Sequence, residues 1–79
     1  MLEELRTDRK VVGIKQLKKA LIAGTAKKVF VADDADPALT EPIVQQCLSD
    51  HVDLITVPTM KQLGDACNIS VAAAVAAII

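Results

Sequence analysis

The chain has almost no aromatic residues, and this limits what its core can be. Phe30 is the single aromatic among 79 residues, which include no tryptophan and no tyrosine. Because 52% of the residues are nonetheless hydrophobic, a packed core is expected, and valine, isoleucine, leucine and alanine must build it. Aliphatic cores of this kind suit layered α/β packing. At this length we expect one small domain over residues 1–79, with no room for a second.

The chain has too few cysteine and histidine residues for a domain stabilised by a metal ion or by several disulfides. Cys47 and Cys67 lie twenty residues apart without a C-x-x-C pair, and His51 is the one histidine. This spacing matches neither a zinc site nor a multi-bridge framework, so we expect two free thiols and no metal. The sequence also lacks an apolar leader and any run of the ~18 apolar residues that a membrane span requires. We therefore expect a cytoplasmic protein with no membrane partner.

Groups that could run an enzymatic reaction are also scarce. The three glycines are well separated, so no glycine-rich loop can cradle a phosphate, and we expect no cofactor. Asp33, Asp34 and Asp36 follow an apolar run, where carboxylates can hold Mg²⁺ for phosphoryl transfer. Turn formation and helix capping are commoner roles for aspartates that precede a proline, here Pro37. We expect no enzyme, and Mg²⁺-dependent phosphotransfer is the alternative that we rank last.

The charges are divided unevenly along the chain. Residues 1–28 hold eight of the nine lysines and arginines against three acidic residues, whereas residues 29–79 hold one lysine and seven acidic residues. The formal net charge of −1 therefore conceals a positive part and a negative part. Such asymmetry favours a polyanionic partner more than the average charge does. Nucleic acid is the first candidate.

The hydrophobic pattern predicts helices that alternate with short strands. The expected strands are residues 11–12, 29–32, 54–57 and 71–79. The expected helices are a short one at Leu2 and Leu5, then 14–23, 40–49 and 60–67. Alternation of this kind predicts an α/β fold, a three-layer α-β-α sandwich with a central mixed four-stranded sheet.

Residues with strong positional preferences support these helix boundaries. Thr40 suits an N-cap, and Pro42 suits the start of the helix that follows it. Thr59 with Gln62 three residues later makes a capping box. Asn68 can take the left-handed conformation that ends a helix.

Polar residues gather on one face of the predicted helix 14–23. At about 100° per residue, Lys15, Gln16 and Lys19 lie opposite its apolar side. A charged face is usually only solvated. This one lies inside the strongly basic part of the chain, so we take it as the candidate binding face.

Four sequence blocks, in order, resemble one known family. They are G-I-K-Q-L-K-K from Gly13, V-F-V-A-D-D-A-D-P from Val29, V-P-T-M-K-Q-L-G from Val57, and N-I-S-V-A-A-A-V-A-A-I-I from Asn68. With them the chain resembles the kink-turn RNA-binding ribosomal proteins of the L7Ae and L30e family, from about residue 10 to residue 79. Archaeal members usually carry Asn-Glu after the glycine. The pair Lys15-Gln16 resembles instead the short bacterial, YbxF-like branch.

The resemblance implies a ribosome-associated protein that binds structured RNA at kink-turns. A kink-turn is a sharply bent RNA helix held by tandem sheared G·A pairs beside a short bulge with a flipped-out base. Carried onto this chain, the family pattern implies that Gly13 lets the protein backbone approach the RNA. Lys15 and Gln16 would reach guanine edges, and Lys19 would hold a guanine or phosphate. This is consistent with RNA physics, because an ordinary A-form major groove is too narrow for side chains and readout needs a distorted element.

The resemblance also assigns roles outside the basic helix. The loop Ile69-Ser70-Val71 covers the flipped-out base, and Lys61, Arg9 and Lys10 engage phosphates, which supply salt-dependent affinity. From the sequence alone, Ile69 and Val71 could equally be core residues that lead into the last strand. We expect the protein to act as a monomer.

A second hypothesis comes from a different class of function. Relatives of this architecture serve stress signalling without binding RNA, so the chain could be a protein-interaction module on the same fold. That hypothesis predicts that Lys15, Gln16 and Lys19 tolerate substitution and that a partner docks on the acidic part of the chain.

Overall fold

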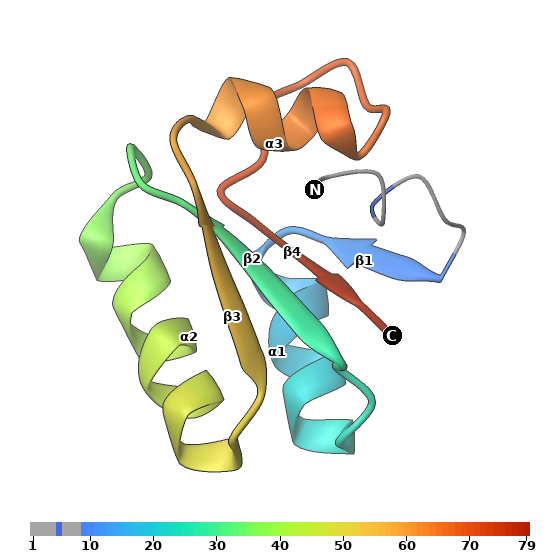
Figure 1. The fold of residues 1–79 in the computed structure, drawn as a ribbon, viewed down its shortest axis with the longest axis vertical. Coiled ribbons are helices and arrows are strands. Elements are labelled where there is room, and N and C mark those ends of the chain that lie inside the picture. The colour runs from blue at the N-terminus through green and yellow to red at the C-terminus, as the bar shows by residue number, and fades with distance from the viewer. Residues whose placement is uncertain (1–4, 6–8) are drawn as a thin grey trace.

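The computed structural model describes Leu5 and residues 9–79 (Figure 1). Its helices are α1 (Ile14–Ala23), α2 (Pro37–Asp50) and α3 (Met60–Ala66). Its strands are β1 (Lys10–Val12), β2 (Lys28–Ala32), β3 (Asp53–Val57) and β4 (Val75–Ile78). The short helix expected at Leu2 and Leu5 lies outside the described residues except for Leu5, which is fully buried. No helix in the described part of the chain is long and apolar enough to cross a bilayer.

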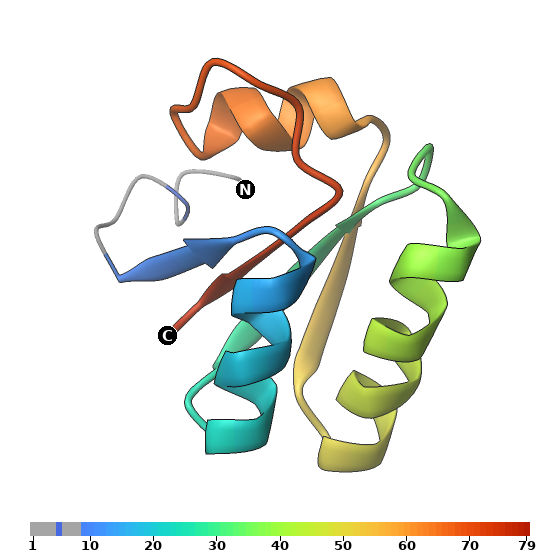
Figure 2. The same ribbon diagram turned by 180° about the vertical axis from the view of Figure 1, so that it is seen from behind.

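The four strands form one mixed sheet in the order β1-β4-β2-β3. β2 and β3 run parallel, whereas β4 is antiparallel to both β1 and β2. Helices α1 and α2 lie side by side on one face, and α3 covers the other (Figures 1 and 2). The predicted three-layer sandwich is therefore confirmed.

Strand β2 is buried on both faces, as its unbroken apolar run predicts. Phe30 and Ala32 pack into the core under α3, while Val29 and Val31 pack into the core under α1 and α2. Successive side chains of a strand point to opposite faces, so a strand between two helical layers needs apolar residues at every position.

The last strand is shorter than expected and lies inside the sheet. The sequence predicts a strand over residues 71–79, but only Val75–Ile78 pair with neighbouring strands. Val75, Ala76 and Ala77 are fully buried, because helices cover both faces of this central strand. Residues 69–74 instead form a loop against α3, in which the Ile69 and Ala73 N–H groups donate to carbonyls of that helix.

Helix α2 begins three residues before the predicted start. Asp36 is its N-cap, since its Oδ1 accepts a hydrogen bond from the Ala38 N–H at 2.9 Å, and Pro37 occupies the first helical position. Asp is a stronger N-cap than Thr, and proline at the first helical position has a backbone φ that its ring already fixes near the helical value. Thr40 is therefore a buried residue within the helix, and Pro42 lies in its interior.

The other predicted helix ends are confirmed. The Thr59 hydroxyl accepts a hydrogen bond from the Gln62 N–H at 3.1 Å at the start of α3. Asn68, just after that helix, has a φ of 60°, in the left-handed region.

Candidate nucleic-acid interface

Segments from four parts of the chain meet at one end of the sheet. The Gly13 N–H donates to the Val75 carbonyl at 3.1 Å, which joins the start of α1 to the start of β4. The turn after β2 is joined to the same region, because the Ala32 N–H donates to the Ala74 carbonyl at 2.9 Å. The start of α1, the turn 33–36, helix α3 and the loop 69–74 therefore border one surface (Figure 1).

The polar face of α1 is exposed beside this junction. Lys15, Gln16 and Lys19 are all exposed, whereas Leu17 on the opposite side is fully buried. Gly13, which precedes the helix, has a φ of 100°. No acidic residue lies in α1, so its lysines act together with the partial positive charge of the helix N-terminus. This surface can attract phosphates and donate hydrogen bonds to base acceptors.

The loop after α3 divides its residues between the core and the solvent. Ile69 is half-buried and packs against the core under α3. Ser70 is exposed, and Val71 is 67% exposed although its side chain is apolar. The core alternative is therefore confirmed for Ile69 and wrong for Val71.

Gly64 is a residue that the sequence argument did not single out. It is buried within α3, where a Cβ would collide with the carbonyl oxygen of Val71. A glycine inside a helix is less favourable than alanine, and this was the available signal in the block V-P-T-M-K-Q-L-G.

The remaining basic residues predicted for the site are spread more widely. Lys61 is exposed in the first turn of α3, at the end of the sheet where the segments meet. Lys10 starts β1 opposite Ile78, and the Arg9 carbonyl accepts from the Ile79 N–H at 3.0 Å. Arg9 and Lys10 therefore lie at the other end of β1 from Gly13.

A family comparison bears directly on this arrangement. Residues 2–79 match the model of the family described as "Ribosomal protein L7Ae/L30e/S12e/Gadd45 family". The chain belongs to this family. The match spans nearly the whole sequence, so every segment at the junction lies within the family's domain.

Curated bacterial proteins resemble the chain over most of their length. An RNA-binding protein of Bacillus pumilus (strain SAFR-032) is 46% identical over 68 residues, which cover 86% of this chain and 83% of that protein. The RNA-binding protein YbxF of Geobacillus stearothermophilus is 40% identical over 75 residues, which cover 95% of this chain and 92% of that protein. These relatives are consistent with the short bacterial branch that the Lys15-Gln16 pair indicates.

A solved structure extends the likeness to the fold. The Giardia lamblia 15.5kD RNA binding protein superimposes with a TM-score of 0.90 at 28% identity, and the match covers 98% of this chain and 68% of that one.

The acidic turn of this L7Ae/L30e family member makes structural hydrogen bonds. Asp36 caps α2, and the Asp34 Oδ1 accepts from the Met60 N–H at 2.7 Å at the start of α3. Among Leu5 and residues 9–79, no three His, Cys, Asp or Glu residues gather closely enough to hold a metal ion. Two of the three carboxylates invoked for the phosphotransfer alternative are thus engaged in the capping roles expected for this turn.

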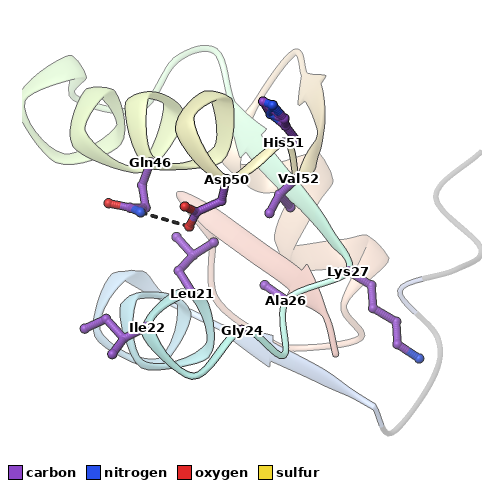
Figure 3. Close-up of a pocket in the computed structure, with 9 residues that line it drawn as sticks. All are labelled: Leu21, Ile22, Gly24, Ala26, Lys27, Gln46, Asp50, His51 and Val52. Carbon is purple, nitrogen blue, oxygen red and sulfur yellow. Dashed lines mark hydrogen bonds between the residues drawn. The ribbon is translucent and has the colours of Figure 1, made fainter.

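A hollow of about 570 Å³ lies at the far end of the helical layer, away from the junction (Figure 3). It is bordered by the segments that follow α1 and α2, from Gly24 to Lys27 and from Asp50 to Val52. The Gln46 side-chain amide donates to the Asp50 carboxylate along its α2 side at 2.8 Å. A smaller apolar groove continues between the two helices, where Ile22 is 88% exposed.

Both cysteines are free and buried, on opposite sides of the sheet. Burial raises the pKa of the Cys47 thiol and of the Cys67 thiol, so neither is activated as a nucleophile.

Proposed function

We propose that this protein binds structured RNA and recognises kink-turns through the surface at the start of α1. The observation that carries the proposal is that the exposed face of Lys15, Gln16 and Lys19 and the loop with the exposed Val71 border the same end of the sheet, where the Gly13 N–H donates to the Val75 carbonyl. It is supported by membership of the L7Ae/L30e family and by relatives that are named RNA-binding proteins.

The two parts of this surface suit the two parts of a kink-turn. Lysine donates to the O6 and N7 acceptors of guanine, and glutamine both donates and accepts, so Lys15 and Gln16 can read the sheared G·A pairs. Lys19, one turn further along α1, reaches a guanine or a phosphate. An exposed apolar side chain such as Val71 can cover a base that has left its stack.

Gly13 supports this contact through its backbone. Its φ of 100° is one that other residues rarely adopt, and a Cβ built on it would have no heavy atom within 4 Å. The open space beside the backbone is where the RNA approaches in this proposal. Ser70 and Ile69 complete the loop.

Lysines and arginines away from the bases supply nonspecific affinity. Lys61 would contact phosphates beside the loop, whereas Arg9 and Lys10 would contact phosphates of a stem that extends past β1. We infer a monomeric, cytoplasmic and ribosome-associated bacterial protein without a cofactor and without enzymatic activity.

Gel-shift titration tests the proposal. The chain is titrated against a kink-turn RNA and against a control in which Watson–Crick pairs replace the sheared G·A pairs, at near-physiological salt. Submicromolar binding to the first RNA and much weaker binding to the second is the expected result. Equal weak binding to both would reduce the basic face to a nonspecific patch.

A specific observation favours the protein-interaction hypothesis as the second candidate. The groove between α1 and α2 is lined by apolar residues that include Leu21, Ile43 and the 88% exposed Ile22, and contiguous apolar surface can mark a contact site. Tolerance of substitution at Lys15, Gln16 and Lys19, together with equal weak binding of both RNAs, would move this function to first place.

A further inference from the structure

Helix α3 and the loop that follows it touch through their backbones. Gly64 has no side chain, and the peptide between Val71 and Ala72 occupies the space where one would be. A built Cβ would collide with the Val71 carbonyl oxygen and come within 3.1 Å of the Ala72 Cα. Real Cβ atoms do not approach backbone this closely, so any residue other than glycine must push the loop away.

Hydrogen bonds hold the loop to the same side of the helix. The Ile69 N–H donates to the Gly64 carbonyl at 3.2 Å, and the Ala73 N–H donates to the Met60 carbonyl at 3.0 Å. The two acceptors are four residues apart and therefore lie on one helical face. Both flanks of the loop tip are thus tied to α3.

The start of α3 is itself tied to the rest of the interface. The Asp34 carboxylate accepts from the Met60 N–H at 2.7 Å, which joins the helix to the turn after β2. Asn68, at a φ of 60°, turns the chain from α3 back toward Gly64.

Because these contacts fix the backbone of the loop, they leave the apolar side chain of Val71 exposed. Ile69 packs inward against the core, and Val71 points into solvent, 67% exposed. Its own packing does not hold Val71 outward, because most of its surface has no protein neighbour. The position of this side chain depends on the contact at Gly64.

We propose that Gly64 is a positioning residue of the RNA site, which seats the loop so that Val71 is presented to an unstacked base. The inference rests on the proposed function. A helix with glycine in its interior is less stable than one with alanine at that position, so the glycine is expected to serve another purpose here. A loop already held in its binding conformation loses less entropy when RNA binds, and the affinity is correspondingly higher.

The test is a double-mutant cycle measured with the same two RNAs. We expect Gly64→Ala to weaken kink-turn binding by about tenfold or more, as Val71→Ser does, and the double variant to bind like either single variant. Binding to the control RNA should stay unchanged, because phosphate contacts on α1 are intact. Gln62→Gly is the matched control, since it perturbs an exposed position of α3 that lies two residues, about half a turn, from Gly64, and it should change affinity by less than about twofold.

The possible outcomes distinguish failure of the Gly64 proposal from failure of the proposed kink-turn recognition. Wild-type protein that does not distinguish the two RNAs overturns the proposed function. Wild-type protein that distinguishes them, with Gly64→Ala binding equally well or with additive losses in the double variant, overturns the role of Gly64. Equal losses on both RNAs by a Gly64→Ala variant that remains folded would mean that Gly64 has no specific effect on the base contact, and would also overturn it.

A second pair of variants covers the case in which thermal melting finds Gly64→Ala unfolded. Asn68 is exposed, and valine is strained at its positive φ whereas glycine is not. Asn68→Val should weaken kink-turn binding and Asn68→Gly should preserve it. Equal affinity of these two folded variants would contradict a loop held in place for binding.

Discussion

Neighbouring residues on α1 take part in different surfaces of this protein. Lys18 lines the groove between α1 and α2, whereas Lys19 lies on the exposed polar face with Lys15 and Gln16. Successive residues of a helix are about 100° apart, so identical side chains one position apart can differ entirely in function. The exposure of this face follows from the apolar pattern of α1, while the contacts that it makes with RNA remain a prediction.

Lys19→Ala tests this face with a matched control. We expect a loss of about 1 to 3 kcal/mol in kink-turn binding and a decrease of about one in the slope of log affinity against log salt. Lys18→Ala removes the same charge from the groove side and should cost much less. Gel-shift titrations at several salt concentrations measure both, and equal effects of the two variants would remove Lys19 from the site.

The loop residues Ile69 and Val71 offer a second contrast. Ile69→Asp places a carboxylate against the core and should lower the free energy of unfolding by about 1 to 3 kcal/mol. Val71→Asp leaves stability unchanged to within about 0.5 kcal/mol, because the side chain is exposed, but weakens RNA binding through repulsion of phosphates. Urea denaturation and the RNA titration separate the two effects, and unfolding by Val71→Asp would contradict the exposed placement.

At the scale of secondary-structure elements, capping decided where α2 begins. The sequence offers two possible starts for this helix, one at Asp36 and Pro37 and one at Thr40 and Pro42. The helix begins at the first pair, which combines a strong N-cap with proline at the first helical position. The other helix boundaries follow local patterns and were predicted to within about a residue. The last strand was predicted too long, because the apolar residues at its start belong to the loop, where Ala73 and Ala74 pack in the core and Val71 is exposed.

Asp36→Ala measures the capping interaction. Loss of the hydrogen bond to the Ala38 N–H should lower the free energy of unfolding by about 1 kcal/mol. Asp33→Ala removes an exposed aspartate from the same turn and should change stability by less than about 0.5 kcal/mol. Chemical denaturation followed by circular dichroism compares the variants, and an equal loss in both would assign the effect to charge rather than to capping.

At the scale of the whole molecule, two kinds of surface occupy different parts of the fold. The junction at the start of α1 combines lysines with an exposed apolar loop. The groove between α1 and α2 continues toward the hollow at the far end of the helical layer (Figure 3). RNA and a protein partner would therefore use different parts of the molecule. The charge asymmetry of the sequence favours the first surface for a polyanion.

Ile22→Glu distinguishes the two functions. In the RNA-binding protein it should change kink-turn affinity by less than about twofold beyond the general effect of one added negative charge. Ala23→Glu, also exposed at the end of α1, adds the same charge outside the groove and provides that reference. A much larger loss for Ile22→Glu, measured in the same titration, would mean that the groove belongs to the RNA site.

The sequence by itself determined what depends on neighbours within one or two turns of chain. The buried run of β2, the polar face of α1 and the cap at Thr59 are set by local periodicity and hydrogen bonding, and the four sequence blocks indicated the family. Only the tertiary structure decided which way the loop residues point, which carboxylate holds α3 and why Gly64 has no side chain. Those contacts join positions as distant as Asp34 and Met60, and local patterns carry no information about which distant backbone groups will meet.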